Sequence, residues 1–272
     1  MTIFAKINTS MKSISELKSE AYTLLSKDWG NSIGVTFILF CVSIAASLIP
    51  YAGDVIGIII AGPLAYGIAL FFLKVSKGEK GEVEDLFHAF KSQEGFSSSL
   101  IAYLFTLIII IPVFIVCIII WVTLFVGNFE NIATLIESGM ASLIDNVGNG
   151  TSSVPYSMDP SFLTEYSSPL FDSGIGTIIL SALLIVFIPI TIISLLLSQV
   201  YFILADQKTI SGFRAIEMSW NLMKGNKKKL FLLQLSFIGW AILSVFTFFI
   251  GLLFLYPYML TTYAKFYQNL YD

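Results

Sequence analysis

The stretch SLIAYLFTLIIIIPVFIVCIIIWVTLFV occupies residues 99–126 and decides the fold class of this chain. It contains no charged residue. As an α-helix it would be about 42 Å long, whereas the hydrocarbon core of a bilayer is about 30 Å thick. The stretch therefore predicts a membrane-crossing helix that tilts, kinks or protrudes, and Pro112 near its middle is the expected kink.

Further apolar runs extend this prediction along the chain. The expected spans are residues 31–49, 55–73, 99–126, 174–204, 230–249 and 252–271. The prolines expected to kink them are Pro63, Pro112, Pro189 and Pro257. Because lipid offers no hydrogen bonds to the backbone, we expect an all-α, polytopic transmembrane helix bundle of six spans.

Three runs leave the number of helices open. The runs that contain Pro112 and Pro189 are long enough to form either one kinked span or two half-helices broken at the proline. Residues 230–271 are long enough for a hairpin of two spans that turns near residues 249–251. A single span followed by a tail outside the membrane is the alternative for this last run.

The composition agrees with a membrane protein. Hydrophobic residues make up 56% of the chain and charged residues only 12%, whereas a soluble domain has about 25% charged residues. The mean hydropathy is +0.85. The net charge of −3 gives no reason to expect nucleic acid as a partner. The lipid bilayer is the expected partner, and the sequence identifies no protein partner.

The distribution of charge predicts a topology. The chain has 15 lysines and arginines, but none lies between Ser92 and Gln207. Basic residues collect in the cytoplasmic loops of membrane proteins. Six spans with both termini in the cytoplasm place every basic residue inside and leave an acidic extracytoplasmic loop at residues 127–173.

Three polar segments have the pattern of amphipathic helices. Residues 11–27 begin with a capping box, in which Ser13 and Glu16 satisfy the first turn. In the second segment Val83, Leu86, Phe87 and Phe90 are spaced to share one face. The third lies within residues 206–229. We expect these helices at the cytoplasmic interface, although packing of the first one on the bundle is equally well supported.

Polar residues within the apolar runs are few. Gln199 and Gln234 are the clearest, and each is explained either by hydrogen bonding between helices or by a place on a substrate path. No catalytic motif is present, and His88 is the only histidine. Cys41 and Cys117 each lie in an apolar run. We therefore expect no enzymatic activity, no cofactor and no metal site.

A basic cluster precedes the last apolar stretch. It consists of Lys224, Lys227, Lys228 and Lys229. These lysines either fix the topology or contact anionic lipid headgroups, which attract each basic residue near the surface by about 1 kcal/mol. Aromatic residues that include Trp240 and Tyr258 follow the cluster. Interface anchoring or helix packing explains them.

Several short motifs together resemble the bacterial integral membrane family called domain of unknown function 975. They are Leu17 with Trp29-Gly30, Gly62-Pro63-Leu64 with Gly67, Val83 with Asp85-Leu86-Phe87 and Phe90, Leu204-Ala205-Asp206, residues 219–226, Leu230-Phe231, residues 236–240, Pro257-Tyr258 and Phe266-Tyr267. The resemblance implies a multi-pass protein of the bacterial plasma membrane. It implies no activity and no functional residues.

Three functional hypotheses follow. The first is a non-enzymatic membrane scaffold or accessory factor in envelope homeostasis or export. The second is a transporter or permease for a neutral or amphiphilic solute, with Gln199 and Gln234 lining its path. The third is an immunity or resistance protein that shields the membrane from a membrane-active peptide. A polar cavity that reaches either glutamine would favour transport.

Overall fold

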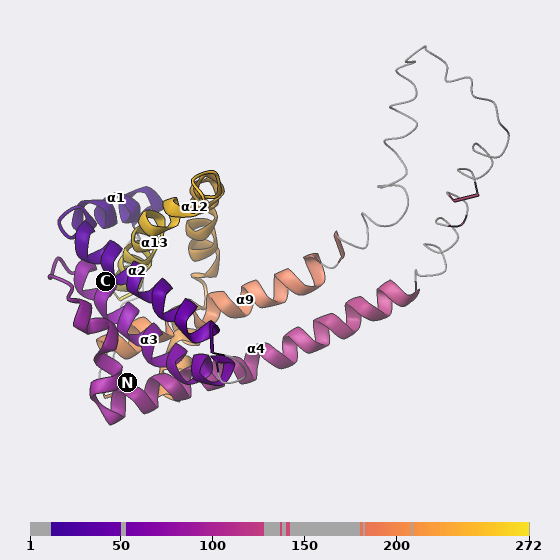
Figure 1. The fold of residues 1–272 in the computed structure, drawn as a ribbon, viewed down its shortest axis with the longest axis horizontal. Helices are drawn as coiled ribbons and strands as arrows, with labels where there is room; N and C mark the ends of the chain where they lie inside the picture. Colours follow the sequence, from indigo (N-terminus) through magenta and orange to yellow (C-terminus); the bar gives the residue numbers. More distant parts are fainter. Residues whose placement is uncertain are drawn as a thin grey trace, which may run out of the picture. The chain divides into compact units, whose positions relative to one another are not determined.

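Every regular element that the structure describes is a helix (Figure 1). The computed structural model describes residues 12–49, 53–127, 137, 140–141, 180–181, 183–207 and 209–271. The predicted all-α class is therefore confirmed for these ranges. The chain divides into two compact units, one formed by Met1–Ile108 with Ile193–Asp272 and the other by Ile109–Ile192.

The first unit holds most of the helices. They are α1 (Ile14–Leu25), α2 (Trp29–Ser47), α3 (Gly53–Ser76), the 3-10 helix η1 (Val83–Lys91), α10 (Val200–Asp206), α11 (Gly212–Met223), α12 (Lys227–Phe246) and α13 (Ile250–Asn269). The second unit contains the π-helix η2 (Leu183–Phe187). Both units share α4 (Gln93–Gly127) and α9 (Ile188–Leu197). The acidic loop predicted at residues 127–173 lies outside the described residues, apart from Gly127 and the helical Glu137, Met140 and Ala141.

Within the described residues, five segments are long and apolar enough to cross a membrane. They are Trp29–Ala46, Val55–Ser76, Gln93–Thr123, Leu184–Asp206 and Lys227–Phe246. Each coincides with a predicted span, and their number is consistent with a multi-pass membrane protein. The sixth predicted span, residues 252–271, falls on α13, which is a helix of 20 residues but is not among these five.

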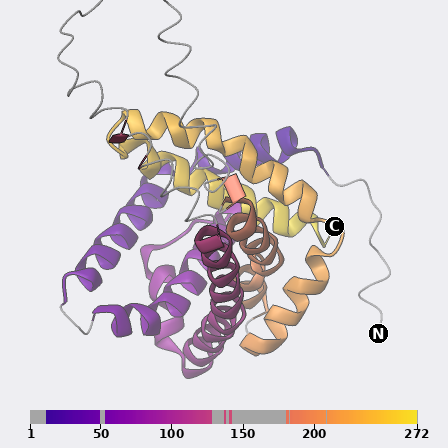
Figure 2. The ribbon, with the colours of Figure 1, turned by 90° about the vertical axis from the view of Figure 1, so that its right-hand side faces the viewer.

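The helices α3 and α13 form the centre of the first unit. α13 packs against α1, α2, α3 and α12, and α3 packs against η1 and α10; the pairing of α12 with α13 can be followed in Figure 2. One buried cluster joins Leu17 of α1 to Phe237 of α12 and Phe266 of α13. A second joins Leu25 of α1 to Phe71 of α3. Both clusters include α1, so α1 is an integral part of the unit.

The first amphipathic segment forms α1, and its capping box is confirmed. The backbone N–H of Ser13 donates to Oε2 of Glu16 at 2.7 Å, and the N–H of Glu16 donates to Oγ of Ser13 at 3.3 Å. Hydrogen bonds from the Ser13 backbone and then from its hydroxyl hold the pKa of Glu16 below its usual value. Leu17, Ala21 and Leu25 are fully buried. Of the two interpretations of this helix, the structure supports packing on the bundle.

The last apolar stretch forms a hairpin of two helices, α12 and α13, as the two-span interpretation predicts. The turn lies slightly earlier than expected. Phe248 and Phe249 have φ angles of 49° and 66°, a left-handed conformation that is uncommon for residues other than glycine. Gly251, which was expected in the turn, lies in the first turn of α13. There its N–H donates to Oγ1 of Thr247 at 2.9 Å.

The two long runs with central prolines behave differently. α4 is continuous through Pro112, which favours one span over two half-helices. In the fourth run Pro189 lies within α9, and the helix is interrupted instead at Ser198-Gln199, between α9 and α10. The π-helix η2 ends two residues before Pro189. Its wider turn accommodates a ring that lacks an N–H and would collide with the preceding turn.

The second amphipathic segment forms η1, a 3-10 helix whose apolar residues do not all share one buried side. Leu86 is fully buried, but Val83, Phe87 and Phe90 are exposed. Because a 3-10 helix repeats every three residues, Ala89 joins Leu86 on the buried side. The backbone carbonyl of Leu86 lies so close to Gly67 that a Cβ atom there would collide with it. Gly67 thus allows η1 to press directly on α3.

Candidate functional site

Gln199 lies at the break between α9 and α10 and is almost completely buried. Its backbone N–H donates to Oγ of Ser219 at 3.3 Å, and this hydroxyl donates to the carbonyl of Leu196 at 2.7 Å. Its side-chain nitrogen donates to Oγ of Ser198, while its oxygen has no partner. Ser219 therefore ties α11 to the broken helix end, which is the role of a structural polar contact between helices.

No hydrogen bond joins Gln234 to Gln199 in the described part of the chain. Gln234 is half-buried on α12, which packs on α13, whereas α10 packs on α3 and α11. Neither glutamine lines either of the two pockets described for this structure. The expectation of a polar path lined by both residues therefore has no support in the described part of the chain.

The basic cluster lies at the junction of α11 and α12. Lys224 is exposed and donates to Oδ1 of Asn221 at 3.1 Å. Gly225 follows with a φ of +88°, and Lys227, Lys228 and Lys229 form the first turn of α12. The charge of Lys229 contributes to the low pKa of Glu16, which places this end of α12 beside the start of α1. None of these four lysines is within ion-pair distance of a described carboxylate.

Charged and polar side chains join several helix ends, and we call this region the polar end. Asp206 at the end of α10 accepts from Lys77 at 2.8 Å and from the hydroxyl of Tyr267 on α13 at 3.2 Å. Gln268 of α13 donates to Oγ of Ser76 on α3 at 2.9 Å. Further contacts pair Lys74 with Asp85 at 2.6 Å, Lys12 with Glu20 at 2.6 Å, and the Lys12 backbone with Asn269 at 3.0 Å. The polar end thus gathers the last turns of three helices and the first turn of α1.

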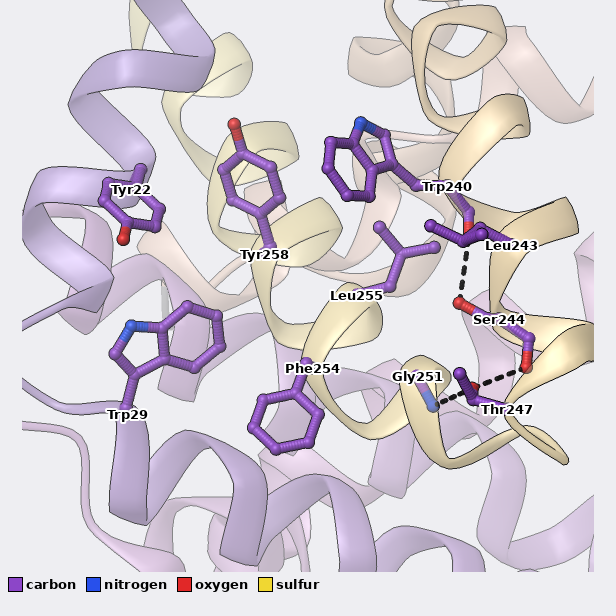
Figure 3. Close-up of a pocket in the computed structure, with 10 residues that line it drawn as sticks. All are labelled: Tyr22, Trp29, Trp240, Leu243, Ser244, Thr247, Gly251, Phe254, Leu255 and Tyr258. Carbon is purple, nitrogen blue, oxygen red and sulfur yellow. Dashed lines mark hydrogen bonds between the residues drawn. The ribbon is translucent and has the colours of Figure 1, made fainter.

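The largest described pocket is an apolar groove of about 470 Å³, which we call the aromatic groove (Figure 3). On one side stand Tyr22 of α1 and Trp29 of α2, and on the other stand residues of the hairpin. The hairpin residues are Trp240, Leu243, Ser244, Thr247, Gly251, Phe254, Leu255 and Tyr258. Ring contacts link its walls: Tyr22 meets Tyr258 edge-on, and Trp29 meets Phe254, each at 6.2 Å between centroids.

Three hydroxyl groups of the aromatic groove already donate to backbone carbonyls. Ser244 donates to the carbonyl of Trp240 at 2.9 Å, and Thr247 donates to the carbonyl of Ser244 at 2.9 Å (Figure 3). The hydroxyl of Tyr258 donates to the backbone carbonyl of Lys18 at 3.3 Å. The groove therefore offers a ligand mainly carbon surface.

A cation lies one helical turn beyond the groove. Nζ of Lys18 lies 4.2 Å from the ring centroid of Phe237 and donates to Oγ of Ser236 at 3.2 Å. Lys18 lies one turn before the groove residue Tyr22 on α1, and Phe237 lies one turn before the groove residue Trp240 on α12. The contact between Lys18 and Phe237 therefore lies just beyond one end of the groove. Burial lowers the pKa of the Lys18 ammonium.

From the sequence alone, Trp240 and Tyr258 of this groove were assigned only to helix packing or interface anchoring. What it lacked was the pairing of α1 and α2 with the hairpin, which no local pattern reveals. The described residues contain no group of three or more side chains that would hold a metal ion. His88 instead stacks on the ring of Tyr66, with 6.2 Å between centroids.

Comparison with known proteins places the chain in a family. A family model covers residues 11–272, and the family is described as "Protein of unknown function (DUF975)". No curated protein and no solved structure matches the chain. Residues that carry the resemblance meet in the structure: Asp206 contacts Tyr267, and Leu86 contacts Gly67. The motifs thus lie at helix-packing contacts.

Proposed function

Since the chain belongs to the DUF975 family, whose description assigns no activity, we propose its function from the geometry. The chain is a six-span, non-enzymatic protein of the bacterial plasma membrane with both termini in the cytoplasm. It acts as a scaffold or accessory factor in envelope homeostasis or export, and its basic surface holds anionic lipid headgroups.

The single observation that carries this proposal is that several helix ends meet at the polar end. The last turns of α3, α10 and α13 meet there through Lys77, Asp206 and Tyr267. The start of α1 joins them, because the Lys12 backbone donates to Asn269. If α3, α10 and α13 all end on the same side of the membrane, the chain must cross back to the other side between each of them, and α4 and α12 are the helices that do so. Such an arrangement supports six crossings with both termini together.

The opposite end of the hairpin is apolar. Phe246, Phe248, Phe249 and Ile250 are all well exposed, and Phe248 is 88% exposed. Exposed apolar residues in such number are unfavourable in water but stable in the acyl region or at the interface of a bilayer. This end therefore supports placing the tip of the hairpin in the outer leaflet, as six spans require.

The unpaired lysines at the α11–α12 junction supply the lipid-binding surface. Lys224 and Lys228 are exposed, while basic residues elsewhere at the polar end pair with acids, as Lys77 does with Asp206. Each basic residue near an anionic leaflet gains about 1 kcal/mol, which corresponds to about a fivefold change in affinity. The four lysines at this junction therefore offer headgroups a group of neighbouring positive charges.

A lipid-retention experiment tests the proposal. The full chain is reconstituted in nanodiscs that mix anionic and zwitterionic lipid, and the lipids retained on mild extraction are identified by mass spectrometry. We expect the triple variant Lys224→Gln, Lys227→Gln, Lys228→Gln to lose the preference for anionic lipid. Lys91→Gln is the matched control, because Lys91 is exposed but paired with Glu84 at 2.7 Å. Equal retention by the triple variant and the wild type would refute this function.

The transport hypothesis keeps one supporting observation. Its path for a neutral solute through Gln199 and Gln234 has no support, as described above. The aromatic groove, however, could accept an amphiphilic solute. Uptake or efflux of a fluorescent amphiphile by proteoliposomes would distinguish a permease from a scaffold. The immunity hypothesis stays a prediction that nothing in the structure tests.

A further inference from the structure

Lys18 is a cation without a carboxylate partner in the described part of the chain. Its ammonium group contacts Ser236 and the ring of Phe237, and no described acid lies within ion-pair distance of it. The two acids of α1 are used elsewhere: Glu16 accepts hydrogen bonds in the capping box, and Glu20 forms an ion pair at 2.6 Å with a different lysine. Because a partly buried charge is unfavourable without a counter-ion, this position favours a carboxylate supplied by another molecule.

The position of this contact decides which molecule supplies the carboxylate. Phe237 lies about 15 Å along the helix from either end of the span-length segment Lys227–Phe246. Lipid headgroups lie outside the hydrocarbon core of the bilayer, so they do not reach this contact in the six-span topology. A helix that crosses the membrane carries side chains at every depth, and ionisable side chains within membranes pair with one another. The expected source of the counter-ion is therefore a protein helix.

The aromatic groove supplies the surface on which such a helix lies. On α12 it extends from Trp240, one turn beyond the Lys18 contact, to Thr247 (Figure 3), a rise of about 10 Å or two helical turns. The groove side chains Tyr22, Trp240 and Phe254 are more than half exposed. A groove of about 470 Å³ accepts the side chains on one face of a helix. The two turns next to the carboxylate are therefore expected to be apolar.

A second copy of this chain lacks a suitable carboxylate. Within the five described segments that are long and apolar enough to cross a membrane, the only acids are Glu94 and Asp206, which stand at segment ends. The predicted sixth span, residues 252–271, contains no acid. None of these spans brings a carboxylate to the middle of a membrane, so the helix that fits the groove belongs to a different protein.

We propose that the aromatic groove docks a transmembrane helix of another protein, and that a carboxylate near the middle of this helix pairs with Lys18. Charge complementarity at Lys18 selects the carboxylate, and the apolar walls between Tyr22 and Leu255 hold the neighbouring side chains. This inference names a partner class for the proposed scaffold and rests on its membrane location, but not on the lysines at the α11–α12 junction. Lipid acyl chains and a second copy of the chain are the other occupants that the experiment distinguishes.

Tryptophan fluorescence in nanodiscs provides the test. The probe is a synthetic transmembrane peptide of leucine and alanine with one central glutamate and a nitroxide label one turn away, and a matched peptide has glutamine in its place. A protein variant that retains only Trp240 reports on the groove, and a variant that retains only Trp121 reports on α4; phenylalanine replaces the other tryptophans. The nitroxide quenches fluorescence by contact. Each labelled peptide is titrated, and an excess of unlabelled peptide should reverse saturable quenching.

We expect the glutamate peptide to reach half-saturation of Trp240 quenching at about tenfold lower concentration than the glutamine peptide, which corresponds to one strong polar contact between helices. Trp121 should show no saturable quenching. Lys18→Gln should remove the preference at Trp240, and Lys18→Arg should retain it. Lys91→Gln is the matched control and should change nothing, because Lys91 is paired with Glu84. If Lys18→Gln does not fold, the comparison of the two peptides in the parent protein still decides.

Three outcomes would overturn the inference. Equal half-saturation by both peptides would show that the groove does not select a carboxylate. Quenching of Trp240 by acyl-brominated lipid, with no saturable quenching by either peptide, would assign the groove to lipid. Loss of that lipid quenching when a nanodisc holds two copies of the chain would assign it to a second copy. The proposed function is judged separately, by lipid retention in the variant lacking Lys224, Lys227 and Lys228. Selective quenching by the glutamate peptide with unchanged retention would leave this inference standing and refute that function.

Discussion

The hydroxyl of Tyr267 donates a hydrogen bond to Oδ2 of Asp206 across 3.2 Å, although the two residues are 61 positions apart in the chain. The other oxygen of the same carboxylate accepts from Lys77 at 2.8 Å. One carboxylate therefore joins α3, α10 and α13. Because all three helices end close to this contact, Asp206 holds their C-terminal ends next to one another.

Removing this carboxylate should destabilise the fold moderately. Asp206→Ala leaves Lys77 without its partner and the Tyr267 hydroxyl without its acceptor. The side chain of Asp206 is 34% exposed, so water compensates in part, and we expect a loss of about 1–2 kcal/mol. Thermal unfolding in detergent measures it. Glu84→Ala, which breaks a more exposed pair with Lys91, should change stability much less. Equal effects would contradict the role of Asp206.

A methyl group at Gly67 should be poorly tolerated. A Cβ atom there would collide with the backbone carbonyl of Leu86, and backbone cannot move aside as a side chain can. We expect Gly67→Ala to cost about 1–3 kcal/mol. Gly57→Ala is the matched control on the same helix, because nothing lies within 4 Å of its Cβ position. It should gain up to about 1 kcal/mol from helix propensity. Both values come from thermal or denaturant unfolding in the same detergent.

These glycines show what sequence could and could not predict. The apolar runs, the capping box at Ser13 and the α12–α13 hairpin follow from local patterns, because lipid burial and capping act over one helix. The collision at Gly67 depends on η1, which is distant in sequence. The interruption at Gln199 likewise depends on Ser219. The groove between α1, α2 and the hairpin is a tertiary feature for the same reason.

We expect Gln199 to have a structural role and not to line a substrate path. Its side-chain oxygen is buried without a hydrogen-bond partner, and an unsatisfied buried acceptor costs about 1–3 kcal/mol. Gln199→Leu removes this oxygen and should leave stability unchanged or increase it. Ser219→Ala, by contrast, leaves the Gln199 N–H and the Leu196 carbonyl without their partner and should cost about 1–3 kcal/mol. Unfolding followed by circular dichroism compares them, and a large loss in Gln199→Leu would refute the structural assignment.

The capping box of α1 should respond to acid. Hydrogen bonds from Ser13 lower the pKa of Glu16 in the folded state. A lowered pKa means that the stabilisation is complete above the unfolded pKa and is lost as the pH falls through the folded one. The amide shift of Ser13, followed by NMR in micelles, should therefore titrate with a midpoint below the ordinary value of 4.5. Glu16→Gln retains the cap without a titrating group, and persistence of the same midpoint in this variant would assign it to another residue.

Whether α13 crosses the membrane decides between six spans and five. The Lys12 backbone donates to Oδ1 of Asn269 at 3.0 Å, so the end of α13 lies beside the start of α1. In the six-span topology, Asn269→Cys and Lys228→Cys should react with an impermeant maleimide only after cells are permeabilised. Ser152→Cys, in the acidic loop outside the described residues, should react in intact cells. Labelling of Asn269→Cys in intact cells while Lys228→Cys stays protected would place the two ends of the α12–α13 hairpin on opposite sides. The contact between Lys12 and Asn269 could then not form in the membrane, because α1 would remain with Lys228 in the cytoplasm.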